Sequence, residues 1–319
     1  MSSPSTPPLP SSITLLPWAL GRALPALTDA LTAHDPSALF LLDYDGTLSA
    51  HVPDPARASL TASMRTQLER LLDAFPGRVV VISGRSRSTL IGFLGPSITS
   101  AIITATSHGH VIEGPNLKLE VGAEFLPDLA AARDELQSTL HGIPGALVED
   151  NLYSITTHTR CVAAEQIPAV HAAVLAAVAK ANASGPRILL RPGAHVLELR
   201  PDCVPPWHKG AAALHLLHAL SPVSAVCAMG DDLTDEDTFK ALLSAAPKGT
   251  SFPIIVAPPD SMLAAPGTAS VVVERPTSAL YALRGPAEVE TMLAALVDAA
   301  HANKGAKVHS SSAFSPLRA

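Results

Sequence analysis

The chain has 319 residues, a formal net charge of −6 and three cysteines. Hydrophobic residues make up 47% of it and charged residues 16%, a composition typical of a globular protein with enough length for two domains. The acidic balance, together with the lack of a dense lysine and arginine block, argues against a nucleic-acid partner. The odd number of cysteines and the lack of metal-ligand spacing argue against a disulfide framework or a zinc site, so buried free thiols are expected.

The N-terminus shows neither the basic region nor the compact apolar stretch of a secretory signal. No uninterrupted apolar run reaches the roughly 20 residues that span a bilayer. We therefore expect a cytoplasmic protein without a membrane partner.

Short apolar runs alternate with longer helical patterns through most of the chain. Continuous apolar runs are typical of parallel strands buried on both faces, so this alternation predicts a parallel sheet covered by helices. Residues 1–12 are rich in serine and proline, residues 303–319 are polar, and both segments are predicted to be disordered tails. The predicted strands are at residues 39–42, 79–82, 101–104, 225–229, 254–256 and 271–273.

Residues 119–201 have a different pattern. Residues 147–159 and 188–199 alternate in part as strands do, and residues 165–181 are typical of a helix ended by a cluster of Asn, Ser, Gly and Pro. This segment is predicted to be a small α+β domain inserted into the parallel-sheet domain, with hinges near its two ends. The parallel-sheet domain would then comprise residues 13–118 and 202–302.

Asp43 and Asp45 directly follow the first apolar run, in the sequence Asp-Tyr-Asp-Gly-Thr-Leu. Catalytic groups of doubly wound sheets lie at the carboxyl ends of strands, and this is such an end. Gly46 allows a tight turn that can bring both carboxylates toward one ligand. An Asx-turn that merely closes the strand is the alternative interpretation of this motif alone.

Ser83 ends the second apolar run and precedes a helix, which is a suitable place for an oxyanion cradle. Considered alone, it is better interpreted as an N-cap residue. Lys209 precedes a helical pattern that begins at Ala211. Such a lysine is usually a solvated helix start, but beside paired carboxylates it is a candidate to neutralise phosphate charge.

Five acidic residues occur among the seven residues 231–237, directly after the predicted strand 225–229. Carboxylates at a helix start are favoured by the helix dipole, which is the simpler explanation. Unpaired carboxylates at the end of a buried strand would repel one another, however, and a hard divalent cation such as Mg²⁺ removes that conflict.

These elements, in this order, resemble the phosphatases of the haloacid dehalogenase superfamily, and more narrowly the trehalose-6-phosphate phosphatase family. The resemblance covers residues 37–295. It implies a Rossmann-like parallel-sheet core of haloacid dehalogenase type with an inserted α+β cap domain. The motifs that carry it are Asp43-Tyr44-Asp45-Gly46-Thr47-Leu48, Ser83-Gly84-Arg85, His108-Gly109, Glu149, His158-Thr159-Arg160, Glu198-Leu199-Arg200-Pro201, Lys209-Gly210 and Gly230-Asp231-Asp232-Leu233-Thr234-Asp235-Glu236.

The resemblance also implies the reaction: Mg²⁺-dependent hydrolysis of trehalose 6-phosphate to trehalose and phosphate, in trehalose biosynthesis, through an aspartyl-phosphate intermediate. Asp43 is then the nucleophile and Asp45 the general acid and base. The implied phosphate ligands are Thr47, Ser83, Arg85 and Lys209. The implied metal ligands are Asp43, Asp45, Asp231 and Asp235, and the implied sugar ligands are His108, Gly109, Glu149, His158, Arg160 and Glu198.

Two positions depart from the family pattern, because Asn151 and Ala194 stand where lysines are usual. If these are true deficits, restoring lysine should improve turnover of trehalose 6-phosphate. The missing cations favour an alternative substrate, another sugar phosphate such as sucrose phosphate. A second alternative is a catalytically silent regulatory subunit of a trehalose-synthesis complex, although no catalytic residue is missing. A trehalose-6-phosphate synthase is the expected protein partner.

Overall fold

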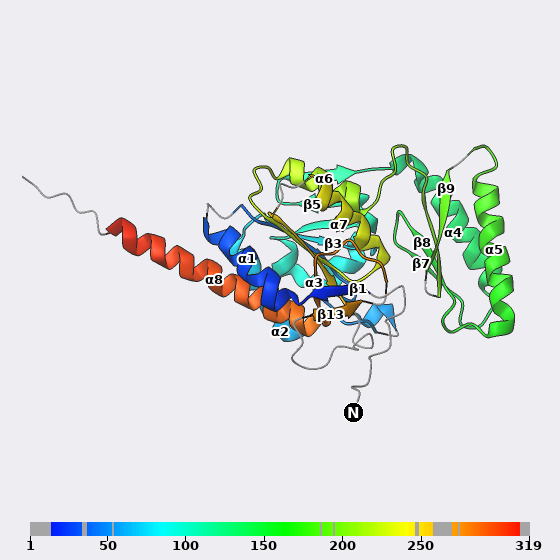
Figure 1. Ribbon diagram of the computed structural model, residues 1–319. Coiled ribbons are helices and arrows are strands. Elements are labelled where there is room, and N and C mark those ends of the chain that lie inside the picture. The colour runs from blue at the N-terminus through cyan, green and yellow to red at the C-terminus, as the bar shows by residue number, and fades with distance from the viewer. Residues whose placement is uncertain are drawn as a thin grey trace, which may run out of the picture. The chain divides into compact units, whose positions relative to one another are not determined.

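The computed structural model of the chain describes residues 14–33, 37–52, 54–185, 187–193, 195–245, 249–257, 270–273 and 275–312 (Figure 1). The chain divides into two compact units, Met1–Val80 with Ala213–Ala319, and Val81–Ala212. The main sheet has eight strands in the order β14-β12-β11-β2-β3-β4-β5-β6. The boundary between the units falls within β3, Val79–Ile82. This architecture confirms the predicted α/β fold class.

Four strands that the first unit contributes to the main sheet are parallel to one another, and residues of β2, β11 and β12 are buried throughout. Burial on both faces explains why the sequence shows continuous apolar runs here rather than alternation. These strands are β2 (Leu39–Asp43), β11 (Val226–Gly230), β12 (Ser251–Val256) and β14 (Tyr281–Leu283).

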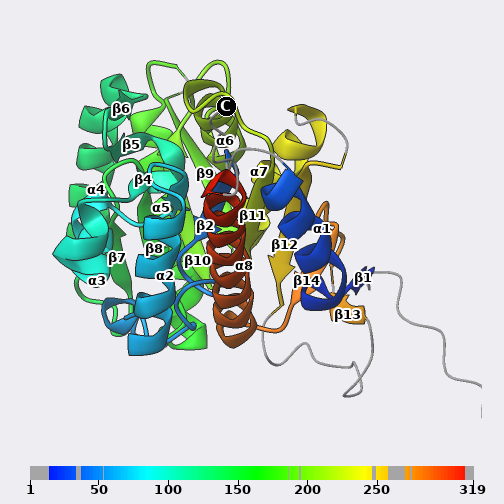
Figure 2. The same cartoon turned by 90° about the vertical axis from the view of Figure 1, so that its left-hand side faces the viewer.

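Helices cover the strands of this unit. Helix α8 packs against α1 and α2 and runs between them in Figure 2. Helix α7 packs against β11 and β12. The bounds of these helices are α1 Ala19–Ala33, α2 Ala62–Ala74, α7 Leu233–Ala245 and α8 Pro286–Ser312.

The predicted strand 271–273 exists as β13 (Ser270–Val273), but its place in the parallel sheet was wrong. It pairs antiparallel with β1 (Thr14–Pro17) in a separate two-stranded sheet. A short apolar run indicates that a strand is buried but not which strand it pairs with, so the sequence could not decide between the two sheets.

In the second unit the main sheet ends in two antiparallel strands that the sequence did not indicate. Strand β4 (Ile103–Thr106) pairs with β5 (Val111–Gly114), which pairs with β6 (Leu117–Glu120). Helix α3 (Arg87–Thr99) follows β3 and begins at the N-cap residue Ser86.

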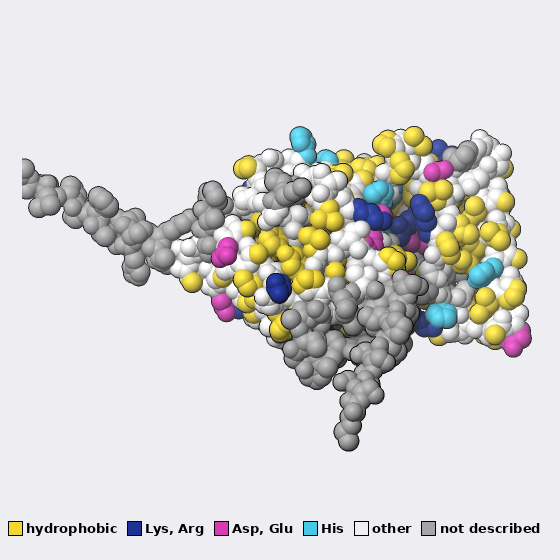
Figure 3. Space-filling view, viewed as in Figure 1, with side chains coloured by type: hydrophobic (Ala, Val, Ile, Leu, Met, Phe, Trp, Pro, Cys, Tyr) yellow, Lys and Arg dark blue, Asp and Glu magenta, His cyan; other side chains and the backbone are white. Residues whose placement is uncertain are grey.

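The rest of this unit contains a four-stranded antiparallel sheet in the order β7-β8-β10-β9. Helices α4 and α5 cover it, and a common apolar core fills the space between helices and sheet. Apolar side chains are also visible over α5 in Figure 3, in agreement with the alanine-rich sequence of this helix. The bounds are β7 Leu147–Asp150, β8 Ile155–His158, β9 Ile188–Gly193, β10 Val196–Pro201, α4 Leu126–Leu140 and α5 Ile167–Ala181.

The α+β character predicted for this segment is confirmed, and each predicted strand segment proves to be a hairpin. Helix α8 continues to Ser312, past residue 303 where the sequence pattern predicts a tail. No proline interrupts residues 287–315, and adding residues to an existing helix costs little. Residues 1–12, the other predicted tail, lie outside the described residues, as does Ala194.

The three cysteines are free thiols in different surroundings: Cys227 is buried, Cys203 is half-buried and Cys161 is exposed. The expectation of burial was therefore wrong for Cys161. Among the described residues, no helix combines the length and the apolar character needed to cross a membrane.

Candidate active site

Asp43 at the end of β2 and Asp45 in the following loop are separated by Tyr44, whose side chain turns inward. The Tyr44 side chain is fully buried and donates a hydrogen bond from its hydroxyl to the Ala58 carbonyl at 2.7 Å. Asp43 is buried and Asp45 half-buried. Gly46 has a φ of +78°, and a Cβ atom there would lie 2.2 Å from Asp231 Oδ2. Only glycine can therefore provide both this turn and the space for Asp231.

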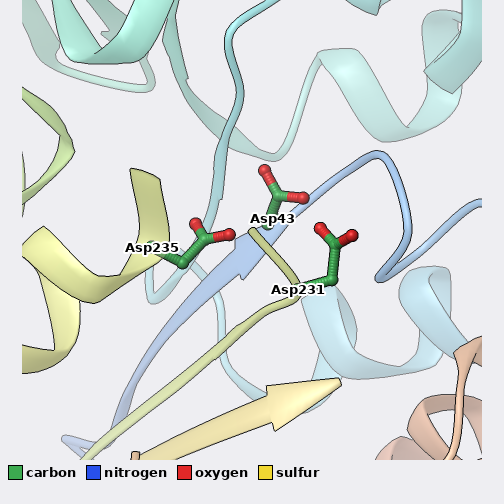
Figure 4. A group of neighbouring side chains, drawn as sticks. All are labelled: Asp43, Asp231 and Asp235. Carbon is green, nitrogen blue, oxygen red and sulfur yellow. The ribbon is translucent and has the colours of Figure 1, made fainter. Parts of the chain in front are cut away.

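Asp43, Asp231 and Asp235 form a carboxylate cluster in the first unit (Figure 4). One ligand atom from each lies within 4.8 Å of the others. Asp43 ends β2, Asp231 directly follows β11, and Asp235 lies in the first turn of α7. Because β2 and β11 are parallel neighbours, their carboxyl ends meet at the same edge of the sheet.

This cluster has the chemistry of a divalent-cation site. Asp43 and Asp235 are only 6% and 4% exposed, so water screens their mutual repulsion poorly. Carboxylate oxygens are ligands that hard cations prefer, and a bound cation would offset the repulsion. The residues present therefore fit a divalent metal ion.

Two residues that the sequence did not indicate hold Asp231 in place. His51 Nε2 lies 2.7 Å from Asp231 Oδ2, and this hydrogen bond raises the pKa of His51. The Arg275 guanidinium donates to the Asp231 carbonyl at 3.0 Å and also pairs with the buried Glu236 at 3.2 Å. His51 and Arg275 lie in irregular segments without a motif, so only the tertiary fold brings them to the cluster.

Thr47 lies on the same loop as Asp43 and is fully buried. Its Oγ1 atom has no hydrogen-bond partner among the described residues. A buried hydroxyl without a partner is costly, and a ligand oxygen would satisfy it. This is the behaviour expected of a phosphate ligand.

In the second unit, the Ser83 loop and the His108 loop are joined by backbone hydrogen bonds. The His108 amide donates to the Ser83 carbonyl at 2.9 Å, and the Ser107 amide donates to the Arg85 carbonyl at 2.8 Å. Ser83 Oγ accepts from the Arg85 amide at 3.1 Å. A Cβ at Gly84 would lie 2.7 Å from the His108 ring, so glycine is needed for this close approach.

The remaining predicted phosphate ligands of this unit are also buried. Arg85 is 8% exposed, and its guanidinium lies 5.0 Å from the centre of the Phe93 ring. Lys209 is 3% exposed and begins helix α6, Lys209–Ala219. A lysine with so little exposure is not the solvated helix start that the sequence left open.

His108, Glu198 and Arg200 form a buried charge network. His108 Nε2 lies 2.8 Å from Glu198 Oε1 and 2.9 Å from Arg200 Nη2, and Arg200 also pairs with Glu198. Burial lowers the pKa of His108 to about 4, and the charge of Arg200 adds to this effect, so the ring is neutral at pH 7. Burial alone would raise the pKa of Glu198, but its contacts with His108 and Arg200 outweigh burial and lower it.

The other predicted sugar ligands are more dispersed. Glu149 Oε2 lies 2.9 Å from His158 Nε2, and this hydrogen bond lowers the pKa of Glu149. The Gly109 carbonyl accepts a hydrogen bond from the Trp207 indole at 3.0 Å. Arg160 is exposed and makes no hydrogen bond or ion pair with any described residue. The structure thus joins His108 with Glu198, and Glu149 with His158, but does not join Arg160 to either pair.

The sheet and the carboxylates at its strand ends define a haloacid dehalogenase fold. The solved C-terminal domain of trehalose-6-phosphate phosphatase from C. albicans shares this fold, with a TM-score of 0.66 and 22% identity over 89% of this chain and 99% of that one. The C-terminal domain of a Candida albicans trehalose synthase regulatory protein is also similar, with a TM-score of 0.53 and 14% identity over 85% and 97%.

The sequence assigns the chain more narrowly. The profile of the family described as Trehalose-phosphatase matches residues 41–286. Trehalose 6-phosphate phosphatase RA3 of Zea mays is 31% identical over 310 residues, which cover 91% of this chain and 76% of the maize protein. The chain belongs to the trehalose-phosphatase family.

Proposed function

We propose that this chain is an Mg²⁺-dependent phosphoric monoester hydrolase that converts trehalose 6-phosphate to trehalose and phosphate. The observation that carries the proposal is the buried cluster of Asp43, Asp231 and Asp235 at the strand ends of a trehalose-phosphatase family member. A maize relative named for this activity supports the choice of substrate.

In the proposed mechanism, an Asp43 carboxylate oxygen attacks phosphorus, and the bond from phosphorus to the sugar oxygen breaks. Asp45 donates a proton to the leaving oxygen. A water molecule then attacks the phosphorylated Asp43 while Asp45 takes up the proton of that water, which releases phosphate and restores both carboxyl groups.

Four residues would hold the metal ion: the carboxylates of Asp43, Asp231 and Asp235, and the backbone carbonyl of Asp45. When bound, the ion neutralises charge that would otherwise repel the phosphate dianion. The phosphoryl oxygens would be held by Thr47, Ser83, Arg85 and Lys209. Burial of these residues supports the assignment, because a hydrogen bond or charge contact is stronger where water is excluded.

The sugar would be bound by the His108-Gly109 loop and by residues of the α+β segment, for which we retain the boundaries 119–201 and the role of a closing cap. A closed cap would exclude bulk water from the phosphoenzyme. The proposed ligands are His108, Gly109, Glu149, His158, Arg160 and Glu198. A cytoplasmic location and association with a trehalose-6-phosphate synthase belong to the proposal on the strength of the sequence resemblance.

One alternative has a specific observation in its favour. The fold is shared with the C-terminal domain of a trehalose synthase regulatory protein, so fold alone does not separate an enzyme from a silent subunit. The complete set of Asp43, Asp45, Asp231 and Asp235 in this chain favours the enzyme.

Phosphate release by the purified chain tests these alternatives directly. The panel should contain trehalose 6-phosphate, sucrose 6-phosphate, glucose 6-phosphate and p-nitrophenyl phosphate, each with Mg²⁺ and with excess chelator. We expect at least tenfold preference for trehalose 6-phosphate and a loss in chelator that added Mg²⁺ reverses. A preference for sucrose 6-phosphate would make that compound the substrate instead of trehalose 6-phosphate. If a folded chain releases phosphate from none of these compounds, the result would favour the regulatory subunit.

A further inference from the structure

Asn151 lies in the turn between β7 and β8, at a position where the family usually has lysine. It is 6% exposed, and its backbone closes the turn: the amide donates to the Ser154 carbonyl and its carbonyl accepts from the Tyr153 amide, both at 2.9 Å. A lysine in so buried a place would need a partner for its charge. Asn151 therefore has a different role from the lysine that is usual at this position.

The contacts of Asn151 reach two segments that carry proposed ligands. Its side-chain Oδ1 accepts a hydrogen bond from the Ser86 amide at 3.1 Å, and its carbonyl accepts one from the Ser107 hydroxyl. Ser86 is the N-cap of α3 and directly follows Arg85. Ser107 directly precedes His108. The turn of the antiparallel sheet is thus fixed to both loops at one buried residue.

Asn151 also influences Glu149, two residues before it on β7, because the pKa of that carboxylate is lowered chiefly by His158 and to a smaller extent by the Asn151 side chain. His158 Nε2 lies 2.9 Å from the same carboxylate. An amide can accept from Ser86 and donate to Glu149 at the same time. An aspartate could only accept at these two positions, and a lysine could only donate.

We propose that Asn151 is a positioning residue that clamps the β7–β8 turn to the N-terminus of α3 and fixes the Glu149 carboxylate to receive a sugar hydroxyl. This inference rests on the proposed function and deepens it. In this chain a neutral clamp takes the place of the family's cation, and recognition of the sugar depends on a fixed hydrogen-bond acceptor rather than on added positive charge.

Two substitutions separate the two arms of the clamp. Asn151→Asp keeps an acceptor for the Ser86 amide but places a second carboxylate beside Glu149. Asn151→Ala removes both arms. Leu152→Ala is the matched control, because Leu152 is in the same turn and is 43% exposed.

Steady-state kinetics test the Glu149 arm. For Asn151→Asp we expect KM for trehalose 6-phosphate to rise about tenfold with kcat nearly unchanged, since the lost interaction acts on the bound substrate and the transition state alike. Hydrolysis of p-nitrophenyl phosphate should stay within twofold of wild type. A KM for trehalose 6-phosphate within twofold of wild type, or an equal loss on both substrates, would overturn the positioning of Glu149.

Hydrogen exchange tests the clamp without relying on activity. In Asn151→Ala, amides of residues 147–158 and of the α3 start should exchange at least tenfold faster than in wild type, whereas Asn151→Asp should retain protection at the α3 start and Leu152→Ala should match wild type. Unchanged exchange in Asn151→Ala would overturn the clamp. If the wild-type chain hydrolyses p-nitrophenyl phosphate but not trehalose 6-phosphate, the proposed substrate fails while the exchange result still decides the clamp.

Discussion

Replacing Glu198 with alanine should damage both the stability of the chain and its chemistry, whereas the same change at Glu149 should affect sugar recognition alone. The Glu198 side chain is 13% exposed and neutralises Arg200, which is 16% exposed. Removing one partner of a buried ion pair leaves an uncompensated charge and costs about 3–5 kcal/mol. Glu149 and His158 are 27% and 24% exposed, and a pair nearer the surface is typically worth about 1 kcal/mol or less.

The chemical effect should differ in the same way. Glu198 contacts His108, whose amide donates to the carbonyl of Ser83, so the loss of Glu198 should disturb the loop of this proposed phosphate ligand. We expect Glu198→Ala to lower kcat/KM for trehalose 6-phosphate and for p-nitrophenyl phosphate, and Glu149→Ala to lower it at least tenfold for the sugar substrate only.

Urea unfolding and steady-state kinetics on both variants, with Glu198→Gln as the control, test this difference. The glutamine keeps a hydrogen-bonding group beside Arg200 without the charge, so its stability should fall between that of wild type and Glu198→Ala. If Glu198→Ala unfolds at the same urea concentration as Glu149→Ala, the buried network does not stabilise the fold as argued.

Three further predictions follow from the site. Asp43→Asn should lower kcat at least a thousandfold with little change in the free energy of unfolding, because the residue is the proposed nucleophile and metal ligand. Activity within tenfold of wild type would exclude the covalent mechanism. His51→Leu should weaken Mg²⁺ binding about tenfold in calorimetry, because the Asp231 carboxylate loses the contact that orients it. His51→Asn should recover part of the affinity. Equal or tighter Mg²⁺ binding in the leucine variant would contradict this role of His51. Acid should destabilise the fold. The pKa of His108 is about 4 in the folded chain, against 6.5 for a free histidine, so the unfolded chain binds the proton more tightly. The free energy of unfolding therefore falls as the pH drops below 6.5. From pH 7 to pH 5 the free energy of unfolding should fall by about 2 kcal/mol. The lowered pKa of Glu198 adds a further loss below pH 4.5. Urea unfolding at the two pH values measures the change, and a His108→Asn variant with the same pH dependence as wild type would show that another group is responsible.

The sequence was sufficient to predict the strands that are buried on both faces of the sheet. Strands β2, β3, β11 and β12 are continuous apolar runs, and parallel order follows from the helices between them. Because parallel strands end at a common edge, the proximity of Asp43, Asp231 and Asp235 was also predictable. Strands β5 and β6 were missed, since charged residues interrupt their apolar residues and four-residue segments are too short to show a clear alternation.

Contacts made by loops were not predictable from pattern. His51 and Arg275 reach Asp231 from irregular segments, and nothing in their sequence neighbourhood indicates a partner. The sequence predicted that lysine at position 151 would improve turnover, but the structure gives Asn151 a buried acceptor role that lysine cannot fill. We therefore expect Asn151→Lys to impair binding of the sugar substrate. Ala194, the second departure, lies outside the described residues.

The pairing of β2 with β11 has a consequence for synthesis of the chain on the ribosome. Strand β2 ends at Asp43, but its neighbour does not begin until Val226, so the ribosome must add most of the chain before the two can pair. At translation rates of about 5–20 residues per second, that interval lasts roughly ten to forty seconds. Throughout it, one edge of the apolar strand Leu39–Asp43 lacks its native neighbour. A nascent chain of this protein should therefore be a client of ribosome-associated chaperones until its last third has emerged.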